Sequence, residues 1–149
     1  MIKDEATLKE NARVSQELGC VDLEGYLTTL EQQYGIKKED CEFRILDIDI
    51  SGLVCPQPGY AQSVYHRIAS DPTYLEAPIL VVKIYDNIQF YLIAGNNRAR
   101  FAYNQKRRSL PAIVIYTYSA DLEAHLDASS ALDSEGGRMR GVADLRPVG

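Results

Sequence analysis

Hydrophobic residues recur along this chain in two spacings, one typical of α-helices and the other of β-strands. A spacing of three to four residues predicts helices over 5–18, 23–34, 60–69, 98–108 and 121–132. Alternating or continuous apolar runs predict strands over 43–50, 78–85, 88–94 and 111–118. Asp86 and Asn87 fit a two-residue hairpin turn, because both residue types tolerate left-handed backbone. The order of these segments predicts an α+β fold, with a small mixed sheet flanked by helices.

The pattern predicts one domain over residues 1–132. Asp22 suits the N-cap of the second helix and Gly35 its C-terminal end, so 5–35 forms an added N-terminal helical segment packed on the sheet. No Gly-, Ser- or Pro-rich linker follows it. Residues 133–149 are rich in glycine and arginine, and we expect a flexible tail that orders on a partner if one binds.

One stretch carries the strongest signal for a binding site. The apolar run 90–94 ends at Gly95, which permits a tight turn or close approach of a ligand. Asn96 or Asn97 suits the N-cap of the next helix, and Arg98 and Arg100 follow at once. Free N–H groups at a helix start favour anions. The stretch therefore predicts a phosphate-binding turn.

The same stretch resembles the central box of the ParB N-terminal domain, whose fold is shared with sulfiredoxin. The resemblance rests on Leu-Ile-Ala-Gly-Asn-Asn-Arg-Ala-Arg-Phe-Ala at 92–102. It extends to the helix-to-strand entry at 75–82, the strand at 110–115, the strand at 43–50 and the turn Pro56-Gln57-Pro58. The similarity therefore covers about residues 43–118, and it implies a ParB/sulfiredoxin-like, stand-alone protein.

The resemblance implies a nucleotide ligand. ParB proteins bind and hydrolyse CTP at this box, sulfiredoxin holds the phosphate of ATP there, and related members include a free-serine kinase and proteins described as nucleases or conjugation inhibitors. The positions that carry over as phosphate or nucleotide ligands are Gly95, Asn96, Asn97, Arg98, Arg100 and Gln57. A nucleoside triphosphate, CTP or ATP, with Mg²⁺ is the implied cofactor.

Departures from the family pattern bear on catalysis. Asn96 and Asn97 stand where sulfiredoxin has its cysteine and histidine, and asparagine is neither a nucleophile nor a proton-transfer group near neutral pH. Gln57-Pro58-Gly59 lacks the arginine of the ParB loop, and Ala124-His125-Leu126 is a poor match to its Glu-Asn-Leu box. No helix-turn-helix follows. The catalytic residues stay unknown.

Charge narrows the choice of partner. The 149-residue chain carries a net charge of −5, so it does not have the basic balance of a general polyanion binder. Its basic residues nevertheless gather between 98 and 108, where DNA contact is expected if it occurs, through Arg98, Arg100, Lys106, Arg107 and Arg108. The Lys106–Arg108 run also suits the negative end of the helix dipole, as ordinary solvated side chains.

Cysteine usage and hydropathy indicate the compartment. The three cysteines, Cys20, Cys41 and Cys55, are widely spaced and include no C-x-x-C pair, which is typical of free thiols in a reducing cytosol. No signal peptide and no span of about 20 apolar residues is evident. The sequence predicts a cytoplasmic protein without a membrane partner.

Three functions remain open. The first is a nucleotide- or phosphate-binding module, regulatory or accessory to a plasmid or phage. The second is a Mg²⁺-dependent nuclease, phosphotransferase or NTPase that uses carboxylates such as Asp47, Asp49 or Asp71, although alternation along the strand also makes Asp47 and Asp49 a solvated face. The third is a protein-interaction module or homodimer in which the arginines make structural contacts. No metal ligand set is predicted.

Overall fold

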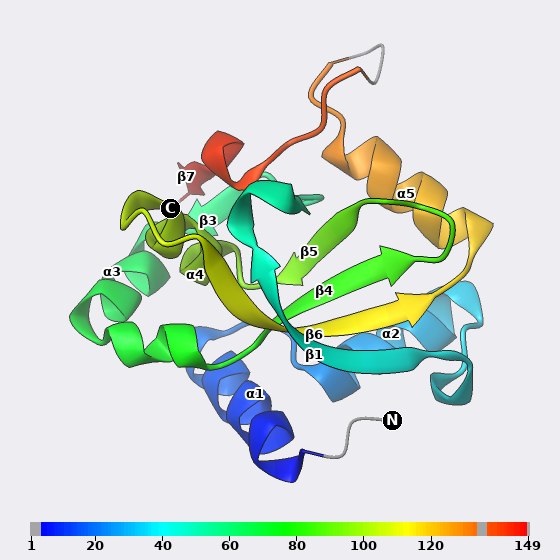
Figure 1. Cartoon of the computed structure of the whole chain (residues 1–149), viewed down its shortest axis with the longest axis horizontal. Coiled ribbons are helices and arrows are strands. Elements are labelled where there is room, and N and C mark those ends of the chain that lie inside the picture. The colour runs from blue at the N-terminus through cyan, green and yellow to red at the C-terminus, as the bar shows by residue number, and fades with distance from the viewer. Residues whose placement is uncertain (1–3, 134–136, 149) are drawn as a thin grey trace.

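The protein has a mixed α+β fold built on one five-stranded sheet (Figure 1). The computed structural model describes residues 4–133 and 137–148. The strands of the main sheet lie in the order β1-β6-β4-β5-β2, with bounds Glu42–Asp49, Ser109–Thr117, Ile79–Ile84, Phe90–Ala94 and Leu53–Val54. The pairs β1/β6 and β4/β5 are antiparallel, whereas β4/β6 and β2/β5 are parallel. The predicted fold class is confirmed.

Helices cover both faces of the sheet, because the central strands are apolar on both sides (Figure 1). One face packs against α2 (Leu23–Tyr34) and α5 (Ala120–Ser130). The other packs against α1 (Glu5–Leu18), α3 (Gln62–Ser70) and α4 (Asn96–Asn104). Short 3₁₀ turns join these elements: η1 (Lys38–Asp40), η2 (Ile50–Gly52), η3 (Pro72–Glu76) and η4 (Val142–Asp144).

The N-terminal helices pack on the domain as the sequence predicts. Asp22 caps α2 by accepting a hydrogen bond from the Gly25 N–H, and Gly35 ends the helix in left-handed backbone. The buried Asn11 side chain ties α1 to its neighbours. Its amide donates to the Pro78 carbonyl, and its oxygen accepts from the Leu23 N–H. One side chain therefore joins α1, α2 and the entry to β4.

The connection between β4 and β5 is longer than a two-residue turn, so that prediction is wrong. Residues 85–89 lie outside both strands. Asp86 adopts left-handed backbone with φ 72°, as its residue type allows. The Asn87 side-chain oxygen accepts from the Gln89 N–H, which stabilises the wider loop.

The predicted flexible tail is also wrong for 137–148. The strand β7 (Arg146–Val148) pairs in parallel with β3 (Gly59–Ala61), a strand at the position where the sequence predicts the first turn of a helix. Val142 and Leu145 are buried in the core, which repays the ordering of this segment. Positions 134–136 and 149 of the predicted tail lie outside the described residues.

Two further findings bear on the chemistry and location of the protein. All three cysteines are free thiols, with Cys55 buried and Cys20 and Cys41 half-buried. In the described part of the chain, no helix combines the length and the apolar composition that crossing a bilayer requires.

Candidate functional site

The turn between β5 and α4 has the backbone that the sequence predicts, with a different cap. Gly95 has φ 124°, and a Cβ there would lie 2.4 Å from the Ile79 Cγ2 atom. Only glycine fits this close approach of the turn to β4. Gly95 itself occupies the N-cap position, and no side chain caps α4. The predicted capping by Asn96 or Asn97 is therefore wrong.

The two asparagines hold a neighbouring loop instead. The Asn96 amide donates to the carbonyls of Gln57 and Gly59, at 3.1 and 2.9 Å. The Asn97 side-chain oxygen accepts from the Ala61 N–H at 2.7 Å. These bonds fix residues 57–61 against the start of α4, so both asparagine side chains already have protein partners at the turn.

Arg98 is buried beneath the turn. It is 1% exposed, and its Nη1 donates to the carbonyls of Ala77 and Pro78 at 3.2 and 3.3 Å. The Nη2 atom lies 3.8 Å from Cys20 Sγ. Burial lowers the pKa of the guanidinium, because the charge has left water. In this structure Arg98 serves the packing of η3, β4 and the N-terminal segment, and it does not reach the surface.

Arg100 is half-buried and bound to the C-terminal segment. Its Nη1 donates to the carbonyls of Val142 and Ala143, at 3.1 and 2.8 Å. The Val142 carbonyl also accepts the Leu145 N–H within η4. The guanidinium also lies over the rings of Tyr60 and Tyr103, 6.0 and 5.3 Å from their centroids. Arg100 thus joins α4 to η4, which explains part of the order in the segment 137–148.

The other end of α4 presents its cations to solvent. Lys106, Arg107 and Arg108 are all exposed, and no ion pair joins them to a carboxylate within the described residues. The helix ends in a Schellman motif, in which the N–H groups of Arg107 and Lys106 donate to the carbonyls of Ala102 and Tyr103. Lys106 occupies its left-handed position, with φ 61°, where glycine is usual. A lysine is held there at a cost in backbone strain.

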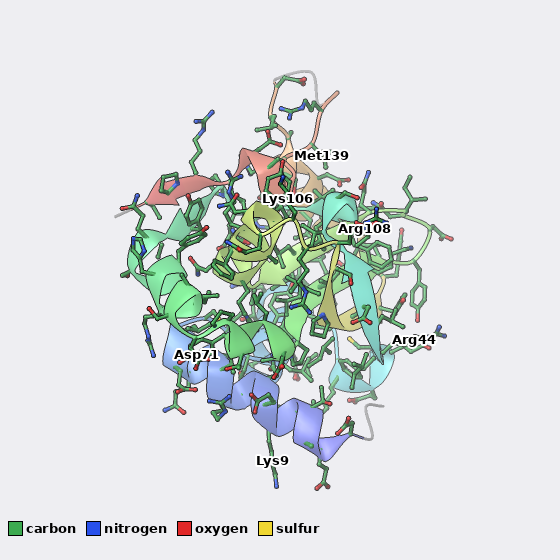
Figure 2. All side chains as sticks on the ribbon, turned by 60° about the vertical axis from the view of Figure 1, so that its left-hand side comes forward. Lys9, Arg44, Asp71, Lys106, Arg108 and Met139 are labelled. Atoms are coloured by element: carbon green, nitrogen blue, oxygen red, sulfur yellow. The ribbon has the colours of Figure 1, made fainter. Side chains whose placement is uncertain are left out.

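These residues form a cleft of about 590 Å³, which we call the basic cleft. Its walls come from the end of α4, the connection 106–108 that leads to β6, the end of β1 and the turn η2. The lining residues are Asp49, Ile50, Ser51, Tyr103, Asn104, Lys106, Arg107 and Arg108. Tyr103 is 44% exposed, and the Arg100 guanidinium lies over its ring. In Figure 2, Lys106 and Arg108 lie in the upper part of the view and Lys9 lies at the lower end of the molecule.

The carboxylates considered for a metal site lie apart. Asp47 and Asp49 are exposed on β1, and Asp71 caps η3 by accepting from the Thr73 N–H. Hydrogen bonds from the side chain and N–H of Ser51 hold the pKa of Asp49 below its usual range, and the Arg108 charge acts in the same direction. Among the described residues, no three His, Cys, Asp or Glu side chains gather as metal ligands.

Cys55 is a packing residue in this structure. It is fully buried, and burial raises the pKa of its thiol to about 12. Since the thiolate is the nucleophilic form, Cys55 is inert near neutral pH. The backbone of its loop is held by Arg140, whose Nη1 donates to the carbonyls of Cys55 and Ser129.

Comparisons with known proteins show a likeness in fold alone. No protein-family model matches the chain, and no curated protein matches its sequence. Among solved structures, it is similar to the crystal structure of protein Atu1540 from Agrobacterium tumefaciens, with a TM-score of 0.50 and 15% identity. The match covers 71% of this chain and 63% of that one, so this chain spans less than two thirds of its relative's length. The likeness supports the α+β architecture and carries no statement about a ligand.

Sequence reasoning gathered five basic residues into one feature, and the structure separates them. Arg98 and Arg100 lie among backbone carbonyls, whereas Lys106–Arg108 line a cleft with Tyr103, Asn104 and Ser51. The sequence offered no sign of the last three. The left-handed backbone of Lys106 could not be predicted either, because a Schellman motif is recognised in a sequence by its glycine, which is absent here.

Proposed function

We propose that the protein binds a phosphate-bearing ligand, a nucleotide, at the basic cleft. The observation that carries this proposal is the set of three exposed cations, free of ion pairs within the described residues, around a cleft of about 590 Å³. That volume is within the range of about 300–1,000 Å³ typical of small-molecule sites. Such a cluster, on a chain whose net charge is −5, offers a local positive site for an anion.

The lining residues supply the contacts that a nucleotide needs. Lys106 acts as a point charge, and the guanidinium groups of Arg107 and Arg108 suit the paired oxygens of a phosphate. The exposed ring of Tyr103 offers a stacking surface to a base. Asp49 also lines the cleft, so a bound phosphate contacts the side nearer to the three cations.

This proposal keeps the nucleotide ligand implied by the ParB/sulfiredoxin resemblance. It places the positively charged contacts to the phosphate at the basic cleft and not at the turn after β5. Binding at the turn itself, through Gly95, Asn96, Asn97, Arg98, Arg100 and Gln57, stays a prediction. The basic cleft is favoured because Arg98 and Arg100 already have protein partners, whereas Lys106–Arg108 face solvent. Among the carboxylates of the nuclease or phosphotransferase hypothesis, Asp49 lines this cleft and Asp47 and Asp71 do not. Free thiols support a cytoplasmic location.

Isothermal titration calorimetry tests the proposal. The probes are ATP, CTP and a short single-stranded DNA, each with and without Mg²⁺. Removing the three cations together (Lys106→Ala, Arg107→Ala, Arg108→Ala) should weaken nucleotide binding at least about tenfold, because the phosphate loses its charged contacts. The matched control removes three exposed lysines elsewhere (Lys9→Ala, Lys37→Ala, Lys38→Ala) and should leave affinity within about twofold.

The outcomes separate the alternatives. Equal affinity in the two triple variants would exclude the basic cleft, and so would an absence of saturable binding to the wild type. Preference for the DNA over both nucleotides, with an affinity that falls steeply with salt, would identify a nucleic-acid surface instead. Release of phosphate that disappears on EDTA treatment and in an Asp49→Asn variant would support the enzymatic alternative.

A further inference from the structure

A second cleft lies on the opposite face of the sheet, between α2 and α5. It has a volume of about 170 Å³, and we call it the tyrosine cleft. Its floor is formed by β5 and the loop after β2, and its walls by the two helices. The lining residues are Tyr26, Thr29, Gln33, Tyr34, Pro56, Gln57, Leu92, Ile93, Leu122, His125, Leu126 and Ser129. Gln57, predicted as a phosphate ligand, lines this cleft and not the basic cleft.

Tyr26 presents an unsatisfied polar group to this cleft. The residue is 9% exposed, yet its hydroxyl makes no hydrogen bond with any described residue. The hydroxyl is not sealed in the interior, and Tyr26 is one of the residues that line the cleft. Burial raises the pKa of Tyr26, and the hydroxyl is therefore a neutral hydrogen-bond donor at physiological pH. A polar group this deeply placed normally has a partner.

Aromatic side chains form part of the walls of the tyrosine cleft, and its polar lining groups carry no formal charge. The rings of Tyr34, on α2, and His125, on α5, lie with their centroids 6.5 Å apart and their planes tilted by 51°. The residues that line the cleft include no lysine, arginine, aspartate or glutamate. Leu92 and Leu126 are almost fully buried and form an apolar base. The polar groups at hand are amides and hydroxyls, which recognise neutral donors and acceptors.

Size and chemistry together select a class of ligand. The volume of about 170 Å³ is below the range of about 300–1,000 Å³ usual for drug-sized molecules, so it suits a single ring system. Flat walls of tyrosine and histidine favour a planar ring. Without a cation, the cleft does not compensate the charge of a phosphate or a carboxylate.

We propose that the tyrosine cleft binds a small, uncharged heteroaromatic ring, which accepts a hydrogen bond from the Tyr26 hydroxyl and packs against the rings of Tyr34 and His125. The site is separate from the basic cleft in its residues and its face of the sheet. The proposal does not depend on nucleotide binding at the basic cleft. Gln57 and Ser129 supply further polar contacts at the edge of the ring.

Saturation-transfer NMR and calorimetry with cytosine, uracil, adenine and nicotinamide test this proposal. At least one of these rings should bind saturably to the wild type. Tyr26→Phe should weaken that binding about five- to tenfold, because it removes the donor and keeps the ring. His125→Ala should also weaken it, by loss of a stacking wall. Tyr26→Phe should leave thermal stability unchanged, since the lost hydroxyl has no protein partner.

The basic-cleft triple variant is the matched control, and it should bind the same ring with wild-type affinity. If none of the four rings binds at millimolar concentration, the proposal is overturned. It is also overturned if Tyr26→Phe and His125→Ala both bind like the wild type. Loss of nucleotide binding in the basic-cleft variant, with ring binding retained, shows that the two sites succeed or fail independently.

Discussion

The two ends of α4 carry cations of the same kind with opposite roles. At its start, Arg98 and Arg100 donate to backbone carbonyls of η3, β4 and η4. At its end, Lys106–Arg108 are exposed and form no ion pair within the described residues, although Arg107 Nε donates to the Ser109 carbonyl. An arginine without a carboxylate partner can still be satisfied by carbonyl oxygens, since its planar group has five donors. Arg98 is therefore out of reach of a ligand and Arg100 is half-buried, whereas the three cations at the end of the helix face solvent.

The contrast predicts that cations at the start of α4 matter most for folding. We expect Arg98→Ala to lower the free energy of unfolding by about 3 kcal/mol, because it leaves a cavity and removes the hydrogen bonds to the carbonyls of Ala77 and Pro78. Urea unfolding measures this change. Arg107→Ala is the matched control from the exposed end and should shift the free energy by less than about 0.5 kcal/mol.

A different outcome would reverse the assignment. If Arg98→Ala unfolds like the wild type but loses nucleotide binding, Arg98 is a ligand residue, and the turn is the phosphate site that the sequence predicts.

The turn itself should be nearly as sensitive. We expect Gly95→Ala to destabilise the protein by about 2 kcal/mol, because the new Cβ meets Ile79 and the backbone is held at φ 124°. Gly52→Ala is the control: no atom lies within 4 Å of the added Cβ, and the effect should stay within about 0.5 kcal/mol. Thermal unfolding of both variants measures the difference. Similar melting temperatures would mean that the turn tolerates a side chain, contrary to the geometry.

These variants also separate the features that the sequence predicts from those that only the folded structure reveals. Its periodicity sufficed for the α+β class, the helix pair at the N-terminus and the strand that leads into Gly95, because each depends on local pattern and burial. The need for glycine at position 95 was likewise predictable in kind. Its physical cause, contact with Ile79 sixteen residues earlier, is a property of the folded sheet.

The errors at the C-terminal segment, the helix cap and the arginines share one cause, which is contact between distant segments. The C-terminal segment has a composition typical of flexible chain, yet β7 pairs with β3 and Arg100 binds η4. The asparagines at 96 and 97 are good caps in isolation, but the loop at 57–61 offers them partners. Whether an arginine at a helix start faces solvent or the interior is decided by the same kind of contact, here by Ala77 and Pro78.

The smallest expected effect is the sharpest test of the end of α4. Lys106 has left-handed backbone, which is unfavourable for lysine and easy for glycine. We therefore expect Lys106→Gly to raise the free energy of unfolding by about 0.5 kcal/mol, or the melting temperature by about 1–2 °C. The same change removes a cation from the basic cleft and should weaken nucleotide binding a few-fold. Stability and affinity thus move in opposite directions.

Asp86→Gly provides the control for this opposition. Asp86 is the other non-glycine residue in left-handed backbone within the described chain, with φ 72°. It does not line the basic cleft. Its replacement should give a similar gain in melting temperature with no loss of nucleotide affinity. Lys106→Gly could instead gain stability and keep its affinity, as Asp86→Gly should. In that case Lys106 does not contact the nucleotide, and its strained backbone has no role in binding. If only Lys106→Gly loses affinity, the strain at the end of α4 is retained for the ligand.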